Sequence, residues 1–386
     1  MTVFSDADRA HMERALALAA NGLYTTTPNP RVGCGIVSGG EVIGEGWHER
    51  AGAAHAEINA LEDVAARGKD PRGATLYSTL EPCNHVGRTP SCAEAVIAAG
   101  VARVVAAMAD PNPEAAGGVG RLRAAGIGVD IGLLEGASRE LNIGFVSRVT
   151  RGRPWVRMKA AASLDGRTAL PSGASQWITG EVARGDGHRW RARACAILTG
   201  GGTVRQDDPE LTVRAVATPR QPQRIVVDSH GETPPTAKVL AGGGAWIVTA
   251  GQRNPQWPAG VEVLVLPNAD RRVDLPALMQ VLGSRGINEL HVEAGAKLNG
   301  ALLAAGLVDE ILLYLAPCLL GDPALGIAEW RDGLSDLSNR VALDLVDVAR
   351  VGDDLRLVAR LRNDSRVVPP VTNDSRVLAR GQGEER

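Results

Sequence analysis

The chain has 386 residues, of which 44% are hydrophobic and 22% are charged, a composition typical of a soluble globular protein with two or three domains. Its formal net charge of -2 gives no indication of binding to nucleic acid or to an acidic membrane. The apolar runs are the length of strands, well below the roughly 20 residues of a membrane span. The N-terminus is acidic where a signal peptide is basic. These features predict a cytoplasmic enzyme.

Residues 1–148 are predicted to form one domain in which helices and strands alternate. Asp6 is predicted as the N-cap of a first helix that ends near Gly22. Two β-rich runs around Gly39 and Gly40 predict a hairpin over 31–48. Further helices are expected at 55–67, 90–100, 118–125 and 135–148, and further strands at 74–80, 101–108 and 127–131. This alternation is typical of an α/β sandwich with a partly parallel sheet.

A second α/β domain is predicted over 154–362, after a basic linker at 149–153. Its strands are expected at 155–164, 195–200, 224–229, 245–250, 261–266, 289–294, 310–317 and 355–362, and its helices at 179–194, 275–283 and 297–305. Residues 363–386 repeat the letters NDSRV and have little apolar periodicity, so we expect a disordered tail there.

The stretch EPCNHVGRTPSC places Cys83 and Cys92 in a turn-rich segment. A disulfide is disfavoured, because a reducing compartment is expected and the chain has five cysteines, an odd number. The order HAE, then PC, then a further cysteine favours a zinc site with His55, Cys83 and Cys92 as ligands and one open position for catalysis. It matches the first half of the zinc deaminase signature, in which Glu57 would be the proton shuttle.

Two observations weaken this zinc prediction when the residues are taken alone. Eight residues separate the two cysteines, whereas the signature has two. HAE and PC are also short enough to occur by chance. A purely structural zinc module is a further alternative, although such sites normally have four protein ligands and only three are found.

Longer motifs resemble the bifunctional deaminase/reductases of riboflavin biosynthesis. TTPNPRVGCGIV, HAEINAL, TLEPCNHVGRTPSC and MADPNP resemble the deaminase domain, and KAAASLDGRTA, SQWITG, LTGGGTVRQDDPELTVR, IVVDS and HVEAGAKLNGALLAAGLVDE resemble the reductase domain. The resemblance covers residues 6–360, and the spacing of eight is typical of that family. It implies a cytidine-deaminase-like α/β/α sandwich followed by an α/β domain similar to dihydrofolate reductase.

The resemblance also implies two consecutive reactions on small phosphoribosyl pyrimidines. The first is zinc-dependent deamination of 2,5-diamino-6-(5-phosphoribosylamino)pyrimidin-4-one, with one Zn²⁺ per chain. The second is NADPH-dependent reduction of the ribose of the aminouracil product to a ribityl chain. The residues implied for the deaminase substrate are Asn29, His48, Arg88, Asp110 and Asn112. From the residues alone, the two Asn and the Asp fit turns equally well, and the His fits a hairpin end at the surface.

In the second domain, the residues alone give weaker evidence of a cofactor site, because the GxGxxG fingerprint of dinucleotide-binding domains is absent. The resemblance implies that NADPH is held by Ala161, Trp177, Thr203, Asp207, Ser229, Gly295, Ala296, Lys297, Leu298, Asn299, Gly300 and Ala301. It implies that the substrate is held by Ser175, Arg191, Leu211, Arg214 and Glu293. Core packing for the Trp and helix capping for Asp207 are the structural alternatives, and no residue stands out as the proton donor.

A rival interpretation is a nucleic-acid base deaminase with an accessory nucleotide-binding domain. Residues 1–147 contain 12 Lys and Arg against 17 Asp and Glu, the wrong sign for a phosphate backbone. A chain with one inactive domain is another alternative, but both sets of motifs look intact. We therefore expect small-molecule substrates, no nucleic-acid or membrane partner, and a homo-oligomer.

Overall fold

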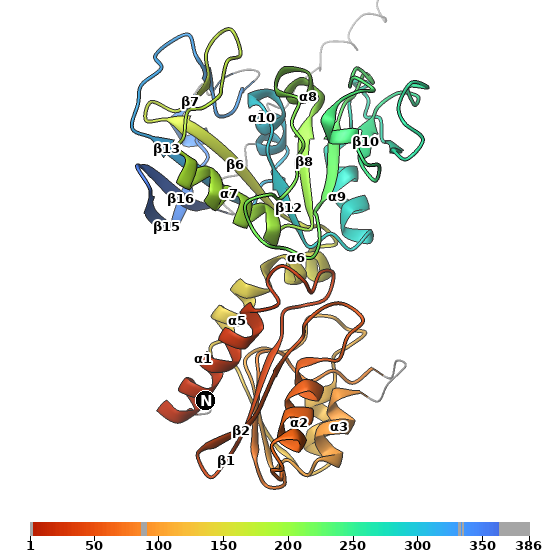
Figure 1. The fold of residues 1–386 in the computed structure, drawn as a ribbon, viewed down its shortest axis with the longest axis vertical. Coiled ribbons are helices and arrows are strands. Elements are labelled where there is room, and N and C mark those ends of the chain that lie inside the picture. Colours follow the sequence, from red (N-terminus) through yellow and green to blue (C-terminus); the bar gives the residue numbers. More distant parts are fainter. Residues whose placement is uncertain (1–2, 86–90, 331–332, 334–335, 363–386) are drawn as a thin grey trace, which may run out of the picture.

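The computed structural model describes residues 3–85, 91–330, 333 and 336–362, which form two α/β halves stacked along the long axis of the molecule (Figure 1). The predicted tail at 363–386 and the predicted substrate residue Arg88 lie outside the described residues. Among the described helices, none combines the length and the apolar character that a bilayer crossing needs.

The N-terminal half contains a five-stranded sheet in the order β2-β1-β3-β4-β5. The strands are β1 (Gly33–Ser38), β2 (Glu41–Trp47), β3 (Thr75–Ser78), β4 (Arg103–Ala106) and β5 (Gly128–Ile131). β1 is antiparallel to β2 and β3, while β3, β4 and β5 are parallel. Gly39 and Gly40 turn the predicted hairpin with φ of 58° and 86°, a region that favours glycine.

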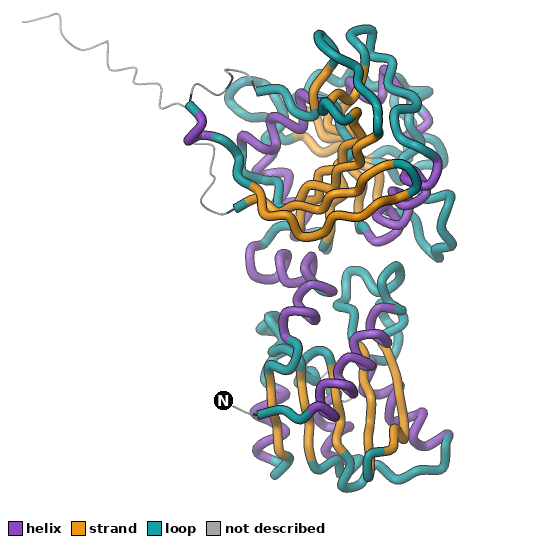
Figure 2. The backbone as a smooth tube through the Cα atoms, turned by 90° about the vertical axis from the view of Figure 1, so that its left-hand side faces the viewer, coloured by secondary structure: helices purple, strands orange, loops and turns teal. Residues whose placement is uncertain are grey.

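Helices cover both faces of this sheet, which is seen edge-on in Figure 1 and with its strands side by side in Figure 2. They are α1 (Asp6–Ala20), α2 (Ala56–Ala66), α3 (Cys92–Ala98), α4 (Gly118–Ala124), α5 (Glu135–Leu141) and α6 (Ile143–Arg151). The apolar side chains of α2, α3 and α4 pack on one face, and those of α1 pack on the other. The predicted sandwich is therefore confirmed. The N-cap of α1 is Ser5 rather than Asp6, because Ser5 and Asp8 exchange hydrogen bonds in a capping box.

The C-terminal half is built on a nine-stranded sheet in the order β11-β10-β9-β8-β12-β6-β13-β16-β15. The bounds are β6 (Trp155–Ser163), β8 (Ala196–Gly200), β9 (Gln223–Val227), β10 (Trp246–Thr249), β11 (Glu262–Val265), β12 (Glu289–Val292), β13 (Glu310–Ala316), β15 (Leu343–Val351) and β16 (Asp354–Leu361). The pairs from β11 to β13 are parallel, and β16 is antiparallel to both of its neighbours. β7 (Arg167–Ala169) and β14 (Leu325–Gly326) form a separate ribbon.

The helices of this half are α7 (Glu181–Arg193), α8 (Gly201–Asp207), α9 (Leu275–Ser284) and α10 (Ala296–Ala304), with short 3-10 turns at Lys238–Leu240 and Leu337–Asn339. α9 and α10 pack on one face of the sheet, and α7 and α8 on the other. The sequence did not predict α8, β7, β14 or β15.

Three apolar side chains of β15 remain exposed on one face of the sheet. The register places Leu343, Leu345 and Val348 opposite residues of β16 that point to the same side. Leu345 and Val348 are 65% and 56% exposed, and neighbouring Leu355 is 40% exposed. We call these four residues the β15 face. Exposed apolar side chains that adjoin one another in this way are a feature of interaction surfaces.

The junction between the halves differs from the prediction of a single helix at 135–148. That helix is broken at Asn142, whose side-chain amide donates to the carbonyl oxygen of Arg31 (2.9 Å) and whose Oδ1 accepts from the Arg31 backbone (2.7 Å). α6 then runs to Arg151, so the segment predicted as a linker at 149–153 begins inside a helix. Gly144 of α6 lies so close to Glu289 and Asn288 of the other half that a Cβ there would clash.

Candidate active sites

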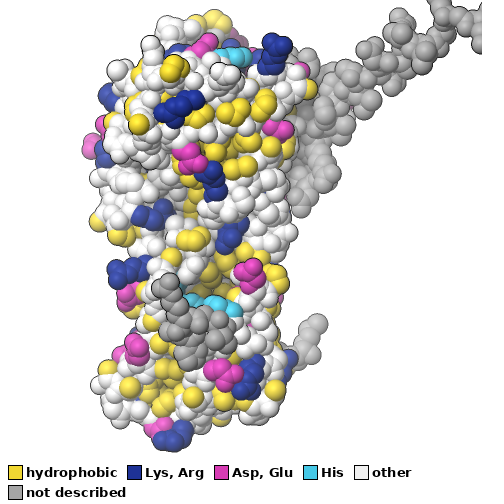
Figure 3. All heavy atoms as spheres, turned by 90° about the vertical axis from the view of Figure 1, so that its right-hand side faces the viewer, with side chains coloured by type: hydrophobic (Ala, Val, Ile, Leu, Met, Phe, Trp, Pro, Cys, Tyr) yellow, Lys and Arg dark blue, Asp and Glu magenta, His cyan; other side chains and the backbone are white. Residues whose placement is uncertain are grey.

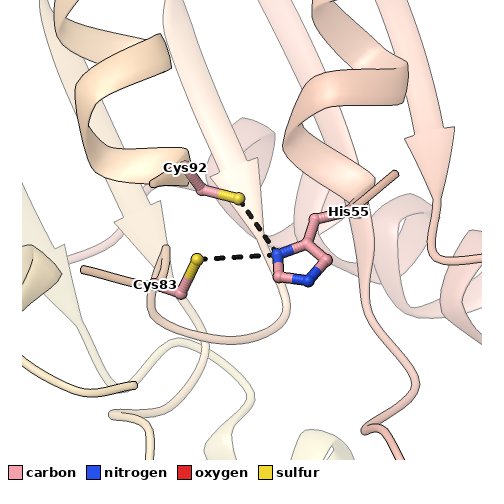
Figure 4. A group of neighbouring side chains, drawn as sticks. All are labelled: His55, Cys83 and Cys92. Atoms are coloured by element: carbon pink, nitrogen blue, oxygen red, sulfur yellow. Dashed lines mark hydrogen bonds between the residues drawn. The ribbon is translucent and has the colours of Figure 1, made fainter. Parts of the chain in front are cut away.

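The three predicted zinc ligands meet in the N-terminal half (Figure 4). His55 is the N-cap of α2, Cys92 opens α3, and Cys83 lies in the loop after β3. His55 Nδ1 is 3.3 Å from the sulfur of Cys92 and 3.5 Å from that of Cys83. The three ligand atoms all lie within 4.8 Å of one another. One imidazole and two sulfurs form a donor set that suits zinc, with a fourth position left open.

The loop that carries Cys83 is held by a residue that the sequence analysis did not single out. Glu81 is buried, and its carboxylate accepts hydrogen bonds from the backbone N–H groups of Asp110, Gly117 and Val119 at 2.9–3.1 Å. Gly118 packs against the same loop, and a Cβ there would lie 1.7 Å from the carbonyl oxygen of Pro82. The start of α4 therefore acts as the support of the cysteine loop.

The electrostatics of the cysteine pair favour a bound cation. Hydrogen bonds from Cys92 and from His55 lower the pKa of Cys83 to about 4. The pKa of Cys92 is raised because it shares its proton with Cys83, because it is buried, and because Glu57 is near. Without a bound cation, only one of the two cysteines is therefore expected to be deprotonated. A dication would stabilise both thiolates, so the residues fit a zinc ion.

Glu57 is placed beside these ligands on the first turn of α2. It is 3% exposed, and its Oε1 accepts a hydrogen bond from the hydroxyl of Ser78 on β3 at 3.1 Å. Burial raises the pKa of its carboxyl group above the ordinary value. A carboxyl group whose pKa is raised in this way is better suited to take up a proton and pass it on.

Two of the predicted substrate residues lie next to His55. The ring of His48 packs edge-on against that of His55 with 5.4 Å between centroids. His48 Nδ1 lies 3.0 Å from the Ala54 carbonyl and donates to it, so its Nε2 accepts from the Asn29 amide at 3.1 Å. This leaves the amide oxygen of Asn29 pointing away from His48. On the face drawn in Figure 3, histidine side chains gather in a hollow below the junction of the halves.

Asp110 and Asn112 occupy the loop after β4. Burial raises the pKa of Asp110 to about 6, with a contribution from the nearby charge of Glu81. Asp110 Oδ1 accepts from the Asn112 backbone at 2.8 Å, and Asn112 Oδ1 accepts from the Glu114 backbone at 3.2 Å. Both side chains therefore serve the turn that their sequence predicted, and Asp110 also adds to the charge around His55.

The second site is a cleft of about 1560 Å³ in the C-terminal half. It is lined by the middle of β6, the end of β8, the residues that follow β12, and the starts of α8 and α10. It brings together the predicted residues Ala161, Trp177, Thr203, Asp207, Ser229, Gly295, Ala296, Lys297, Leu298, Asn299, Ala301, Ser175, Arg191, Leu211, Arg214 and Glu293. Gly300 is not among the lining residues. A Cβ at Gly300 would lie 1.9 Å from the carbonyl oxygen of Glu329, so this glycine allows close packing behind α10.

An ion pair and a neutral histidine mark the polar end of this cleft. Arg191 binds Glu293 through two hydrogen bonds of 2.5 and 2.8 Å. Burial alone would raise the pKa of Glu293, but the Arg191 guanidinium holds it well below its usual range. Burial and the charge of Arg191 lower the pKa of His188 to about 4, so the imidazole is neutral and its Nδ1 accepts from the Arg214 backbone at 3.2 Å. His188 and Lys159 also line the cleft, and neither was among the residues predicted for the reductase site.

The cleft fits a dinucleotide in size and in chemistry. Its volume exceeds the roughly 300–1,000 Å³ of a pocket for one small ligand, so a cofactor and a substrate can share it. Gly295 caps α10 without a side-chain hydrogen bond, which leaves backbone N–H groups for an anion. The buried Oδ1 of Asn299 has no hydrogen-bond partner among the described residues.

Two family models match the chain, one in each half. The model of the cytidine and deoxycytidylate deaminase zinc-binding region matches residues 5–108. The model of the RibD C-terminal domain matches residues 154–357. The first match ends before β5, and the junction between the two sheets falls between the two matches.

Curated proteins and solved structures resemble the chain over most of its length. The Escherichia coli riboflavin biosynthesis protein RibD is 47% identical over 89% of this chain and 97% of its own. The Haemophilus influenzae protein of the same name is 45% identical over 92% of this chain and 97% of its own. The structure of Acinetobacter baumannii RibD is 41% identical, covers 92% of this chain and 99% of its own, and superposes with a TM-score of 0.85.

Proposed function

The chain belongs to the RibD family of bifunctional deaminase/reductases of riboflavin biosynthesis, and from this premise we propose how its two sites divide the work. The N-terminal half removes an amino group from the pyrimidine 2,5-diamino-6-(5-phosphoribosylamino)pyrimidin-4-one. The C-terminal half reduces the ribose of the resulting aminouracil to a ribityl chain. The meeting of His55, Cys83 and Cys92 beside buried Glu57 is the observation that carries the deaminase assignment.

We propose that His55, Cys83 and Cys92 hold one zinc ion per chain, which when bound supplies an activated water at neutral pH. Glu57 would carry protons from that water to the pyrimidine on the carboxylate oxygen that Ser78 does not occupy. Of the two protons of the water, one would go to the ring nitrogen and one to the departing amine, which leaves as ammonia while the oxygen stays on the ring carbon. Asn29 and His48 orient the pyrimidine over this centre, and Arg88, Asp110 and Asn112 are further substrate residues.

We propose that NADPH lies along the start of α10, with its phosphates on the backbone of Gly295–Ala301, while Ala161, Trp177, Thr203, Asp207 and Ser229 line the rest of its site. Bound NADPH would supply the hydride. The substrate occupies the polar end of the cleft, where Ser175, Leu211 and Glu293 contact it. Arg191 and Arg214 bind its phosphate, since guanidinium groups suit phosphate oxygens.

We further propose that the chain works in the cytoplasm as a homo-oligomer. All five cysteines are free in the structure, as expected in a reducing compartment. The apolar β15 face gives a second copy of the chain a surface to bury.

Zinc analysis combined with two activity assays tests this division of work. We expect about one zinc per chain, ammonia release from the diaminopyrimidine, and NADPH oxidation on the aminouracil phosphate. Removal of zinc with a chelator should abolish ammonia release and leave NADPH oxidation intact, because the sites lie in separate halves. Ammonia release that persists at full rate without zinc would contradict the proposal.

A further inference from the structure

The loop over residues 24–31, here called the Asn29 loop, belongs to the N-terminal half but is held by groups of the C-terminal half. Arg220 Nε donates to the carbonyl oxygen of Tyr24 at 2.9 Å. Asn288 Nδ2 donates to the carbonyl oxygen of Pro28 at 3.0 Å. The backbone of this loop is therefore held at its start and at its middle by groups of the other half of the chain.

An ion pair fixes the end of the same loop. Arg31 Nη1 donates to Glu289 Oε1 at 2.8 Å, and both side chains are almost fully buried. Glu289 also binds Arg157 and Arg193 of its own half, at 3.1 and 2.7 Å. Glu289 is thus rigidly held, and it transmits that rigidity to Arg31 because a buried ion pair has a narrow range of geometries.

The Asn29 loop leads directly into the zinc site. Asn29 follows Pro28 in the chain, and its amide donates to His48 Nε2 at 3.1 Å. The His48 ring packs against His55. The position of the Asn29 amide oxygen therefore depends on where the backbone at Pro28 is held.

We propose that Asn288 and Glu289 of the C-terminal half are positioning residues for deamination in the N-terminal half. They act through the Asn29 loop and hold the Asn29 amide at the place where the pyrimidine binds. The inference rests on the proposed deaminase function. It adds that the deaminase site depends on two residues of the reductase half, so the two halves are coupled in function as well as in sequence.

A substitution of Asn288 can disturb the position of the Asn29 loop without removing the contact of Asn288 with α6. Its Oδ1 accepts from Arg148 Nε of α6 at 2.6 Å, while its Nδ2 donates to Pro28. Asn288→Asp keeps an acceptor for Arg148 and replaces the donor to Pro28 with a carboxylate oxygen, which repels the carbonyl. Asn254→Asp is the matched control, because Asn254 Nδ2 donates to the carbonyl of Gly231 within the C-terminal half at 3.3 Å.

The test compares both activities in the full-length variants. For Asn288→Asp we expect kcat/KM of ammonia release to fall about 10- to 100-fold, mainly through a higher KM, because a misplaced contact weakens substrate binding. Zinc content and NADPH oxidation should stay at the wild-type level, and Asn254→Asp should leave all three unchanged. An unchanged KM for deamination in Asn288→Asp would overturn the inference.

A second variant guards against simple misfolding. If Asn288→Asp also lowers zinc content or NADPH oxidation, Asn288→Ala removes the donor without adding a charge, and the same rise in KM is expected. Normal deamination by Asn288→Ala would overturn the inference. Failure of the proposed function would be distinct from either result, because the wild-type protein itself would then release no ammonia from the pyrimidine.

Discussion

The Glu57 carboxyl group is buried and interacts with all three predicted zinc ligands. We expect Glu57→Gln to lower kcat for ammonia release by about 100- to 10,000-fold, because the amide cannot carry the proton. Zinc content and NADPH oxidation should remain at the wild-type level. Steady-state assays with metal analysis check this, and near-normal ammonia release would remove Glu57 from the mechanism.

At the same scale, the sequence identified the residues with distinctive chemistry and missed those that support them. The meeting of His55, Cys83 and Cys92 could be predicted because the zinc deaminase signature has those residue types in that order. Glu81 could not, because an acidic residue before a proline carries no signal until the three N–H groups that it binds are known. The close contact of Gly300 with Glu329 could not be predicted, because a glycine in a binding motif and a glycine in a tight helix contact look the same in sequence.

Among the elements, α4 supports the cysteine loop through one close contact at Gly118. Gly118→Ala would place a methyl group 1.7 Å from the Pro82 carbonyl oxygen, so the loop must move, at a cost of about 1–3 kcal/mol or more. We expect lower zinc content and weaker deamination, with NADPH oxidation unchanged. Gly120→Ala in the same helix is the control, since a Cβ there meets nothing within 4 Å. Equal zinc content in the two variants would contradict this role.

The elements also show where periodicity was informative and where it was not. Most strands of the two sheets were predicted, because buried strands are rich in β-branched residues. The break at Asn142 was missed, because the polar residue looks compatible with a helix until its hydrogen bonds to Arg31 are seen. β15 was missed although its sequence LDLVDVARV alternates in part, because a β-bulge between Leu345 and Asp347 shifts the pattern by one residue.

At the scale of the whole molecule, the β15 face predicts how copies of the chain associate. We expect Leu345→Glu to weaken self-association about 30-fold or more, since burial of one such side chain contributes about 2 kcal/mol. Light scattering over a range of concentrations measures this. Val265→Glu, on the opposite edge strand β11 and 52% exposed, is the control and should not change the oligomeric state. An unaltered assembly in Leu345→Glu would exclude the β15 face.

The stability of the junction between the halves should depend on pH through Glu289. Burial alone would raise the pKa of Glu289, but Arg193, Arg31 and Arg157 hold it far below the usual range. A depressed folded-state pKa stabilises the protein above the unfolded pKa of about 4.3, and this contribution is lost as the pH falls through the folded value. Glu289→Gln should therefore cost about 3–5 kcal/mol at pH 7.

Urea unfolding of the wild type and of Glu289→Gln at several pH values checks this prediction. The difference between the two proteins should be largest near neutral pH and should shrink as the pH falls below about 4. A difference that stays constant from pH 7 to pH 3 would show that the carboxylate charge is not what matters.

One strand, β12, has a consequence for protein engineering. Its first residue, Glu289, holds the Asn29 loop of one half, and the chain just beyond its end places Glu293 in the cleft of the other half. A chimera could join the first half of this chain to the second half of a relative. Its Asn29 loop and its β12 would then come from two different proteins, and their contacts would no longer match. Grafts should therefore exchange residues 24–31 together with β12, even though more than 250 residues separate them in the sequence.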